Sequence, residues 1–196
     1  MRKRVFLGFY DSANFVTLGG LLFSLAGCFL AVWGNIRFAV LCLIIAGIAD
    51  LFDGFIAGRL ERKEIEKAFG VQLDSLVDVL SFGITPVLIS FCNGATEIYA
   101  LIVYALYLVA AVIRLAYFNT AAAPENKGFS QGLPVTYAAL ILPIAFLIPV
   151  TVLHVVMFAV LAVAYMVNVR IPKPRGVWYV VFPLLAVGLI IAWCLL

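Results

Sequence analysis

Charged residues are scarce in this chain of 196 residues, at 12% of the total. Soluble domains carry about 25% charged residues, and apolar types make up roughly 45–50% of their sequence. Here apolar residues reach 66%, which leaves too few charges to cover the surface of a water-soluble globule. The composition therefore excludes a soluble domain, a disordered tail and a nucleic-acid-binding protein, and it predicts an integral membrane protein.

Metal and redox motifs built on cysteine or histidine are also absent. The four cysteines form no C-x-x-C pair, and the only histidine, His154, has no cysteine near it at ligand spacing. Zinc sites, redox dithiols and disulfide scaffolds are therefore not indicated. We expect His154 to be a packed or interfacial residue. No internal repeat interrupts the chain, so we expect one domain over residues 1–196.

Long apolar runs take the place of these motifs. A membrane-spanning helix needs about 20 mainly apolar residues. Seven segments qualify, at residues 13–34, 37–58, 72–92, 97–119, 133–149, 151–169 and 177–196. Pro143 and Pro149 predict a break between the fifth and sixth segments. We therefore expect an all-α, polytopic transmembrane helix bundle with six core spans and an additional C-terminal span at 177–196.

The ends of these segments differ in charge. Of the 13 lysine and arginine residues, eleven lie in the segments 1–12, 59–71, 120–132 and 170–176. Cytoplasmic loops carry such an excess, so we expect a multi-pass protein of the cell (cytoplasmic) membrane with its N-terminus inside. The basic start lacks an A-x-A-like cleavage site and is expected to be retained. We expect residues 1–12 to form an interfacial helix, with Phe6, Phe9 and Tyr10 facing lipid.

Four aspartates occur inside the predicted spans, where a carboxylate costs about 2.5–3.5 kcal/mol at the helix centre. Asp50 and Asp53 are three residues apart near the end of the second span. Asp74 and Asp78 are four residues apart near the start of the third. Each spacing places both side chains on one face of a helix. The charged segment 59–69 is expected to be a short loop between antiparallel helices, so all four carboxylates can meet at similar depth.

Carboxylates that share a pocket repel one another unless they are protonated or held by positive charge. Oxygen ligands without histidine or cysteine suit a hard cation such as Mg²⁺ or Mn²⁺. We predict two such cations between the helices. Cation pairs of this kind serve phosphoryl transfer, where they orient phosphates and neutralise developing charge. The alternative is that the aspartates pair with Arg59, Arg62 or Arg114, or line a proton path.

The residues around the aspartates carry a resemblance to a known family. The pattern Asp50-x-x-Asp53-Gly54-x-x-Ala57, followed by Gly70-x-x-x-Asp74-x-x-x-Asp78, resembles the signature of the CDP-alcohol phosphotransferases. These membrane enzymes move a substituted phosphoryl group from a CDP-linked donor to an alcohol and release CMP. In one departure, the family's arginine directly after the alanine is replaced by Gly58, and Arg59 comes one residue later. Arg62 and Lys63 are other candidates for its role.

Later segments resemble the phosphatidylserine synthase branch of that family. They are Asp74–Pro86, Arg114–Asn119, Phe129–Pro134, Met166–Pro172 and, more weakly, Asn14-x-x-Thr17. The resemblance reaches from the first span to about Arg175 and leaves the last span outside. It implies an enzyme of phospholipid biosynthesis that transfers a phosphatidyl group from CDP-diacylglycerol to L-serine, giving phosphatidylserine and CMP. It also implies a homodimer. The distribution of basic residues places the aspartates toward the cytoplasmic face.

The resemblance implies roles for individual residues. Asp50, Asp53, Asp74 and Asp78 become metal ligands, and Asp78 is also the candidate general base. The donor is assigned to Asp50, Asp53, Gly54, Ala57, Arg59 and Gly70. We expect Gly70 to open the third helix, where free backbone N–H groups face a phosphate. The acceptor is assigned to Arg114, Tyr117 and Asn119, with Arg114 holding the serine carboxylate. The alternative for Arg114 is a snorkelling side chain paired with lipid headgroups or an aspartate.

Two alternative functions stay open at this point. The first keeps the enzyme class and changes the acceptor to glycerol 3-phosphate or inositol phosphate. A phosphorylated acceptor needs a basic cluster beside the aspartates, whereas Arg114 is the one basic residue within a predicted span apart from the terminal Arg37. The second is a divalent-cation transporter that uses the aspartates as its ion site. That architecture predicts broken helices in two repeated halves, and the sequence shows no repeat.

Overall fold

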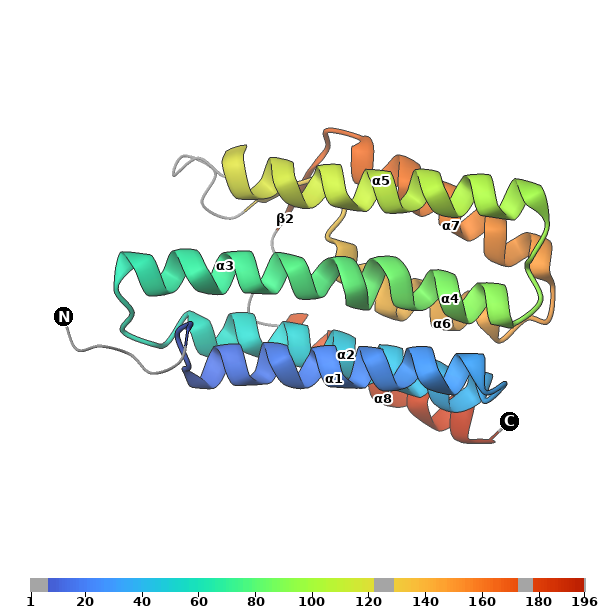
Figure 1. Ribbon diagram of the computed structural model, residues 1–196, viewed down its shortest axis with the longest axis horizontal. Helices are drawn as coiled ribbons and strands as arrows, with labels where there is room; N and C mark the ends of the chain where they lie inside the picture. The colour runs from blue at the N-terminus through green and yellow to red at the C-terminus, as the bar shows by residue number, and fades with distance from the viewer. Residues whose placement is uncertain (1–6, 122–128, 173–177, 196) are drawn as a thin grey trace.

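The computed structural model describes residues 7–121, 129–172 and 178–195. Most of this part is helical, and the long helices run side by side along one direction (Figure 1). The α-helices are α1 (Ser12–Val32), α2 (Ile36–Ala57), α3 (Glu64–Asp78), α4 (Thr85–Cys92), α5 (Ile98–Ala121), α6 (Ala138–Phe146), α7 (Thr151–Met166) and α8 (Trp178–Leu195). A π-helical turn, η1 (Val79–Ile84), joins α3 to α4, and a 3₁₀ turn, η3 (Val135–Tyr137), precedes α6.

The predicted bundle of apolar helices is confirmed. Four helices of the described part are long and apolar enough to cross a membrane: Ser12–Val32, Ile36–Ala57, Glu64–Cys92 and Ile98–Thr120. Three shorter apolar helices follow, at Val135–Phe146, Thr151–Met166 and Tyr179–Leu195. The break between α6 and α7 contains Pro149, as expected, whereas Pro143 lies inside α6. The chain is therefore a polytopic membrane protein of helical architecture.

The third long helix begins at Glu64, so the prediction of a charged loop through residue 69 is wrong for its second half. The Lys63 backbone N–H donates a hydrogen bond of 3.0 Å to the Glu66 side chain. The Lys67 ammonium contacts Glu64 at 2.8 Å. Such capping, with acidic side chains in the first turn, starts the helix several residues before the long apolar run. Gly70 consequently lies beyond the first turn, and the prediction that it opens the helix with a free N–H is wrong.

Residues 7–11 before α1 form a bend and an irregular segment, so the prediction of an interfacial helix over residues 1–12 is wrong for residues 7–11. Asp11 caps α1 by accepting a hydrogen bond of 2.9 Å from the Asn14 backbone N–H. The Phe9 ring packs on Phe69 of α3, with 5.5 Å between ring centres. The Tyr10 hydroxyl donates back to the Leu7 carbonyl at 2.6 Å. Phe6 and the rest of residues 1–6 lie outside the described part of the chain.

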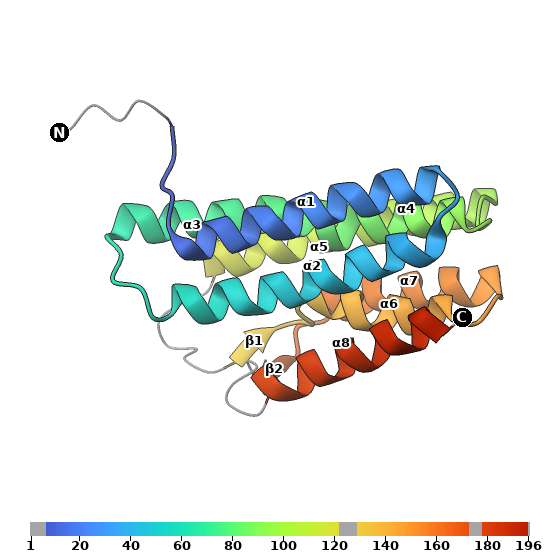
Figure 2. The same cartoon turned by 90° about the horizontal axis from the view of Figure 1, so that it is seen from below.

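The continuous helix α3–η1–α4 occupies the middle of the bundle. It contacts α1 on one side, and η1 contacts α5, which packs against α7 on the other (Figure 1). The last helix, α8, runs along α2 and α6 (Figure 2). Trp193 of α8 is buried, and its indole N–H donates to the Pro143 carbonyl at 3.2 Å. The C-terminal span is therefore packed into the bundle.

A small sheet lies beside the start of α8 and was not expected from the apolar pattern (Figure 2). The strands β1 (Phe129–Gln131) and β2 (Arg170–Pro172) pair antiparallel, with Ser130 opposite Ile171 (Figure 2). This pairing joins the segment before α6 to the segment after α7. It therefore ties these two connections to each other.

His154 is packed, in agreement with the sequence-based expectation. It is fully buried in α7, and its Nε2 atom lies 2.9 Å from the Ile148 carbonyl oxygen. Its ring meets Phe146 edge to face, with 5.0 Å between ring centres. These contacts connect α7 to the end of α6, so the residue has a structural explanation.

Gly47 gives the bundle a direct test of packing. A Cβ atom added at Gly47 of α2 would lie 2.5 Å from the Ala139 Cβ atom of α6, whereas one added at Gly19 of α1 would meet nothing within 4 Å. We expect Gly47→Ala to lower the free energy of unfolding by about 1–3 kcal/mol, because the two helices must separate. Gly19→Ala is the matched control and should be neutral or stabilising. Thermal unfolding in detergent measures both, and equal midpoints would contradict this packing.

Candidate functional site

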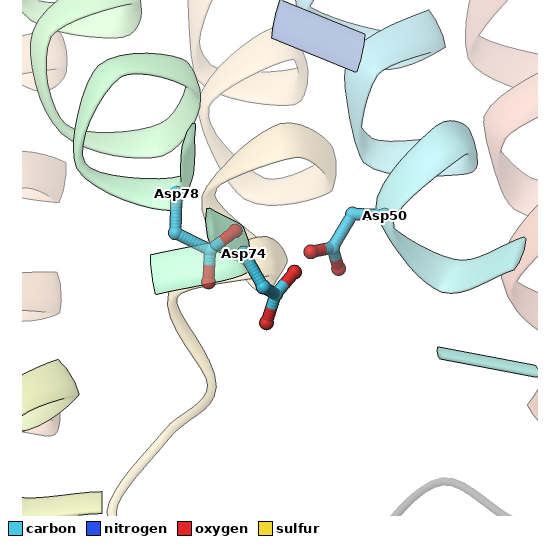
Figure 3. Close-up of side chains that lie close together, drawn as sticks. All are labelled: Asp50, Asp74 and Asp78. Carbon is cyan, nitrogen blue, oxygen red and sulfur yellow. The ribbon is translucent and has the colours of Figure 1, made fainter. Parts of the chain in front are cut away.

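Three aspartates from two helices converge at the centre of the candidate site. One carboxylate oxygen each from Asp50, Asp74 and Asp78 lies within 4.8 Å of the other two. Asp50 projects from α2 toward Asp74 and Asp78 of α3 (Figure 3). Asp78 is buried at 6% exposure, and the other two are half-buried. The predicted spacing therefore brings three of the four aspartates into one group, which we call the carboxylate cluster.

Asp53 lies beside the carboxylate cluster but is not a member of it. It is buried at 6% exposure and accepts a hydrogen bond of 2.5 Å from the Thr17 hydroxyl of α1. It is also close enough to Asp50 and Asp74 to repel them electrostatically. The one-turn offset from Asp50 thus points Asp53 toward α1, where a hydroxyl holds one of its oxygens.

A second hydroxyl, missed in the sequence, orients Asp50. Thr136 in η3 donates a hydrogen bond of 2.8 Å to Asp50 Oδ2, on the side chain that also lies in the carboxylate cluster with Asp78. Thr136 follows Gly132 and Pro134 and lies in the short turn that leads into α6. In the sequence, Thr136 is a hydroxyl-bearing residue in an otherwise apolar run. That pattern alone does not identify Asp50 as its hydrogen-bond partner.

The π-helical turn η1 follows Asp78 directly. Such turns are often found at functional sites, because they shift the following side chains around the helix axis. The Tyr107 hydroxyl of α5 donates to the Phe82 carbonyl at 2.5 Å, and the Thr85 hydroxyl donates to the Leu80 carbonyl at 2.9 Å. These donors satisfy carbonyl groups of the turn, so the irregular backbone after Asp78 is held in place.

Arg114 of α5 supplies positive charge at the carboxylate cluster. It is 8% exposed and is attracted electrostatically by Asp78, Asp50 and Asp74. Its guanidinium also lies over the Phe118 ring, 5.1 Å from the ring centre. The open alternative that Arg114 pairs with an aspartate therefore agrees with its position. One guanidinium does not balance three carboxylates, so further positive charge fits the site.

Arg114 also lines a cavity of about 250 Å³ next to the cluster. Its wall comes from α5, α7 and the segments beside the sheet. The lining residues are Ile113, Arg114, Tyr117, Gly132, Tyr165, Met166, Val167 and Asn168. Arg114 thus faces both the carboxylates and a space large enough for a small polar molecule.

The other two predicted acceptor residues, Tyr117 and Asn119, lie in different places. Tyr117 lines the cavity and is 47% exposed. Asn119 does not line it. Its side-chain amide donates a hydrogen bond of 2.8 Å to the Ser75 hydroxyl, beside Asp74. Tyr165 of α7 and Asn168, which follows α7, also line the cavity and were not assigned from the sequence.

The residues assigned to the donor lie toward the end of α2. A Cβ atom on Gly54 would meet nothing within 4 Å, so space is open next to Asp53. The helix ends at Ala57, with Gly58 as its C-cap. Arg59 turns back on the helix, where its Nη1 donates to the Phe55 carbonyl at 3.2 Å. Its guanidinium carbon lies 3.4 Å from the centre of the Phe55 ring.

The donor set of the carboxylate cluster fits a hard divalent cation. Three carboxylate oxygens stand within 4.8 Å of one another, and no nitrogen or sulfur ligand joins them in the described part of the chain. Mg²⁺ and Mn²⁺ prefer such oxygen ligands. The buried, mutually repelling carboxylates also need compensating positive charge beyond Arg114. The residues present can therefore hold a divalent cation.

Comparison with known proteins places this geometry in a family. A sequence model described as CDP-alcohol phosphatidyltransferase matches residues 10–194. The archaetidylserine synthase of Methanothermobacter thermautotrophicus is 32% identical over 111 residues, which are 56% of this chain and 46% of that protein. The CDP-diacylglycerol–serine O-phosphatidyltransferase of Saccharomyces cerevisiae is 32% identical over 105 residues, 50% of this chain and 37% of its own. The CDP-diacylglycerol–serine O-phosphatidyltransferase of Helicobacter pylori is 27% identical over 142 residues, which are 71% of this chain and 58% of that protein.

The matches differ in how much of each protein they cover. The chain spans about half the length of these curated relatives, at 46%, 37% and 58%. The family model, in contrast, covers nearly the whole chain and includes α8. The expectation that the last span lies outside the resemblance is therefore wrong.

Proposed function

Because this chain belongs to the CDP-alcohol phosphatidyltransferase family, we propose that it transfers the phosphatidyl group of CDP-diacylglycerol to the hydroxyl of L-serine. The products are phosphatidylserine and CMP, which makes this an enzyme of phospholipid biosynthesis. The observation that carries the proposal is the carboxylate cluster with Arg114 between it and a cavity for a small molecule. The relatives named for serine transfer support this acceptor over glycerol 3-phosphate or inositol phosphate. Membership of this enzyme family argues against the alternative of a divalent-cation transporter.

The reaction forms one P–O bond and breaks another. The serine hydroxyl oxygen attacks the phosphorus that carries the diacylglycerol, and the bond from that phosphorus to the bridging oxygen breaks, so that CMP leaves. Asp78 accepts the proton from the serine hydroxyl. Its contribution comes mainly from position, since it stands at the buried end of the cluster beside Arg114.

Divalent cations complete the proposed site. Asp50, Asp74 and Asp78, with Asp53 beside them, would hold Mg²⁺ or Mn²⁺, two ions in our proposal. When bound, such ions neutralise the charge of the diphosphate and polarise the phosphorus for attack. Thr136 and Thr17 each donate a hydrogen bond to one oxygen of Asp50 and Asp53. These hydroxyls orient the carboxylates, as outer-shell partners do in metal sites.

The donor is placed at the end of α2. The cytidine rests on Gly54 and Ala57 and on the Gly70 face of α3, with Arg59 as a further predicted donor contact. Open space at Gly54 supports this placement. The excess of basic residues in the predicted loops puts this end on the cytoplasmic side of the cell membrane, with the N-terminus inside. We further propose one domain over residues 1–196 and a homodimer.

Arg114, with Tyr117 in the same cavity and Asn119 beside Asp74, is proposed to recognise serine. A guanidinium binds a carboxylate through two parallel hydrogen bonds, which an ammonium cannot reproduce. We expect Arg114→Lys to raise the KM for serine about 10- to 100-fold, with a smaller change in the KM for CDP-diacylglycerol. Arg37→Lys, at the far end of α2, is the matched control. Steady-state kinetics that show equal changes in both KM values would assign Arg114 to the donor or to the fold.

The experiment for the function is CMP release by the purified chain in detergent. CDP-diacylglycerol and Mn²⁺ or Mg²⁺ are supplied with L-serine, glycerol 3-phosphate or inositol phosphate in separate reactions. Release that depends on serine supports the proposal. Release with one of the phosphorylated acceptors alone would retain the family reaction and overturn the serine assignment. No release with any of the three would overturn the proposed function.

A further inference from the structure

The cavity beside Arg114 has a second wall whose chemistry the proposed function does not use. This wall is formed by the end of α7 and the segment that follows it, and it includes Tyr165 and Asn168. Arg114, on the α5 wall, supplies a cation. Among the described residues that line the cavity, none is acidic. An ammonium group that enters the cavity therefore meets neutral oxygen atoms on the α7 wall and not a carboxylate.

The end of α7 leaves a backbone carbonyl group without an N–H partner. The last four carbonyl groups of a helix have no partner inside it. The Ala164 carbonyl accepts a hydrogen bond of 3.3 Å from the Leu133 N–H. The Val169 N–H, which would reach Tyr165 in a longer helix, donates instead to the Val167 carbonyl at 2.9 Å. Among the described backbone N–H groups outside the helices and strands, none donates to the Tyr165 carbonyl.

Gly132 keeps this carbonyl group uncovered. Its φ angle is +73°, which favours glycine. A Cβ atom added there would lie 3.0 Å from the Tyr165 carbonyl oxygen and 3.5 Å from the Val167 carbonyl oxygen. Because glycine has no side chain, only its hydrogen atoms stand against these oxygens. Gly132, Tyr165 and Val167 all line the cavity, so the carbonyl oxygens lie at its wall.

Asn168 adds a side-chain oxygen to the same wall. It follows the end of α7, is exposed and lines the cavity. An amide side chain offers one oxygen acceptor, and an ammonium group has three N–H donors to satisfy. The C-terminal end of a helix also carries a partial negative charge, equivalent to about half an elementary charge. The α7 wall is therefore suited to a cation, whereas the α5 wall with Arg114 is suited to an anion.

We propose that the end of α7 binds the α-ammonium group of the acceptor amino acid, through the Tyr165 carbonyl oxygen and the Asn168 side-chain oxygen. This inference rests on the proposed function, because serine is the acceptor assigned there. Three groups on the serine Cα atom then reach three places: the carboxylate binds Arg114, the hydroxymethyl group faces Asp78, and the ammonium binds α7. Such an arrangement selects an amino acid over alcohols that lack an amino group.

The first test is Asn168→Leu in the full-length protein in detergent, assayed by serine-dependent CMP release. Leucine has a similar size and lacks the amide oxygen. The KM for serine is expected to rise about tenfold, because a hydrogen bond to a charged group is lost. The kcat and the KM for CDP-diacylglycerol should stay within about twofold. Asn35→Leu, at the exposed start of α2, is the matched control. An unchanged serine KM in a folded Asn168→Leu variant would overturn the inference.

3-Hydroxypropionate separates ammonium binding from a role of Asn168 in shaping the cavity. This molecule keeps the hydroxyl and the carboxylate of serine and lacks the ammonium. Its inhibition constant should exceed the serine KM of the wild type about tenfold or more, and it should change less than about twofold in Asn168→Leu. Arg114→Lys, in contrast, should raise the values for both molecules. Equal increases for both molecules in Asn168→Leu would overturn the inference.

Wild-type protein that releases no CMP with serine would instead reject the proposed function. The ammonium site is then tested by thermal unfolding in the presence of CDP-diacylglycerol and Mn²⁺, because a ligand that binds the folded state raises the midpoint. Serine should raise the midpoint of the wild type more than 3-hydroxypropionate does, and the difference should disappear in Asn168→Leu. Equal shifts by the two molecules in the wild type would overturn the inference.

Discussion

Asp78→Asn is expected to lower the rate of CMP release by about 10³-fold or more, while the protein stays folded. The carboxylate of Asp78 is buried, belongs to the carboxylate cluster and is attracted electrostatically by Arg114. Asparagine keeps its size and removes both the proton acceptor and one metal-ligand charge. It also relieves repulsion within the carboxylate cluster, so the midpoint of thermal unfolding without metal should not fall.

The matched control for this change is Glu97→Gln, an acid-to-amide substitution at an exposed position before α5. It should retain the wild-type rate. The measurement is initial CMP release at saturating serine and metal, together with thermal unfolding of each variant. An Asp78→Asn protein that keeps more than about a tenth of the wild-type rate would remove Asp78 from proton transfer and metal binding.

Removal of divalent cations is expected to abolish the activity, with a loss of about 10³-fold or more. The carboxylate cluster has three oxygens within 4.8 Å and one neighbouring guanidinium, so most of its charge is left for cations to balance. Protein treated with a chelator and then dialysed should regain its rate with Mn²⁺ or Mg²⁺. Bound metal should also stabilise the fold, by about 2.7 kcal/mol at a concentration 100 times its Kd.

Asp74→Asn distinguishes a specific site from a general salt effect. The amide removes one ligand charge and one source of repulsion, so the metal-free variant should unfold at the same or a higher temperature than the wild type. Its midpoint should no longer rise when Mn²⁺ is added. If Mn²⁺ stabilises this variant as much as the wild type, the cluster is not the binding site.

Much of the site follows from local spacing. Aspartates three and four residues apart in two apolar helices must share helix faces, and a short connection must place those faces together. The long apolar runs likewise determine the helices, because membrane-spanning segments satisfy their own backbone hydrogen bonds. The convergence of Asp50, Asp74 and Asp78 was therefore predictable, and so was the fold class.

Other features depend on contacts between distant segments, which spacing does not reveal. Thr136 reaches Asp50 across 86 positions of the chain, and Thr17 reaches Asp53 across 36. The start of α3 at Glu64 depends on capping by Lys63 and Glu66, which apolar periodicity does not register.

The most direct test of the central claim is the lipid product. Purified protein is incubated with CDP-diacylglycerol, Mn²⁺ and isotopically labelled L-serine, and the extracted lipids are examined by mass spectrometry. The account predicts labelled phosphatidylserine in amounts equal to the CMP released, and none with chelator or with Asp78→Asn. CMP release without labelled lipid, or labelled lipid that still forms with Asp78→Asn, would contradict it.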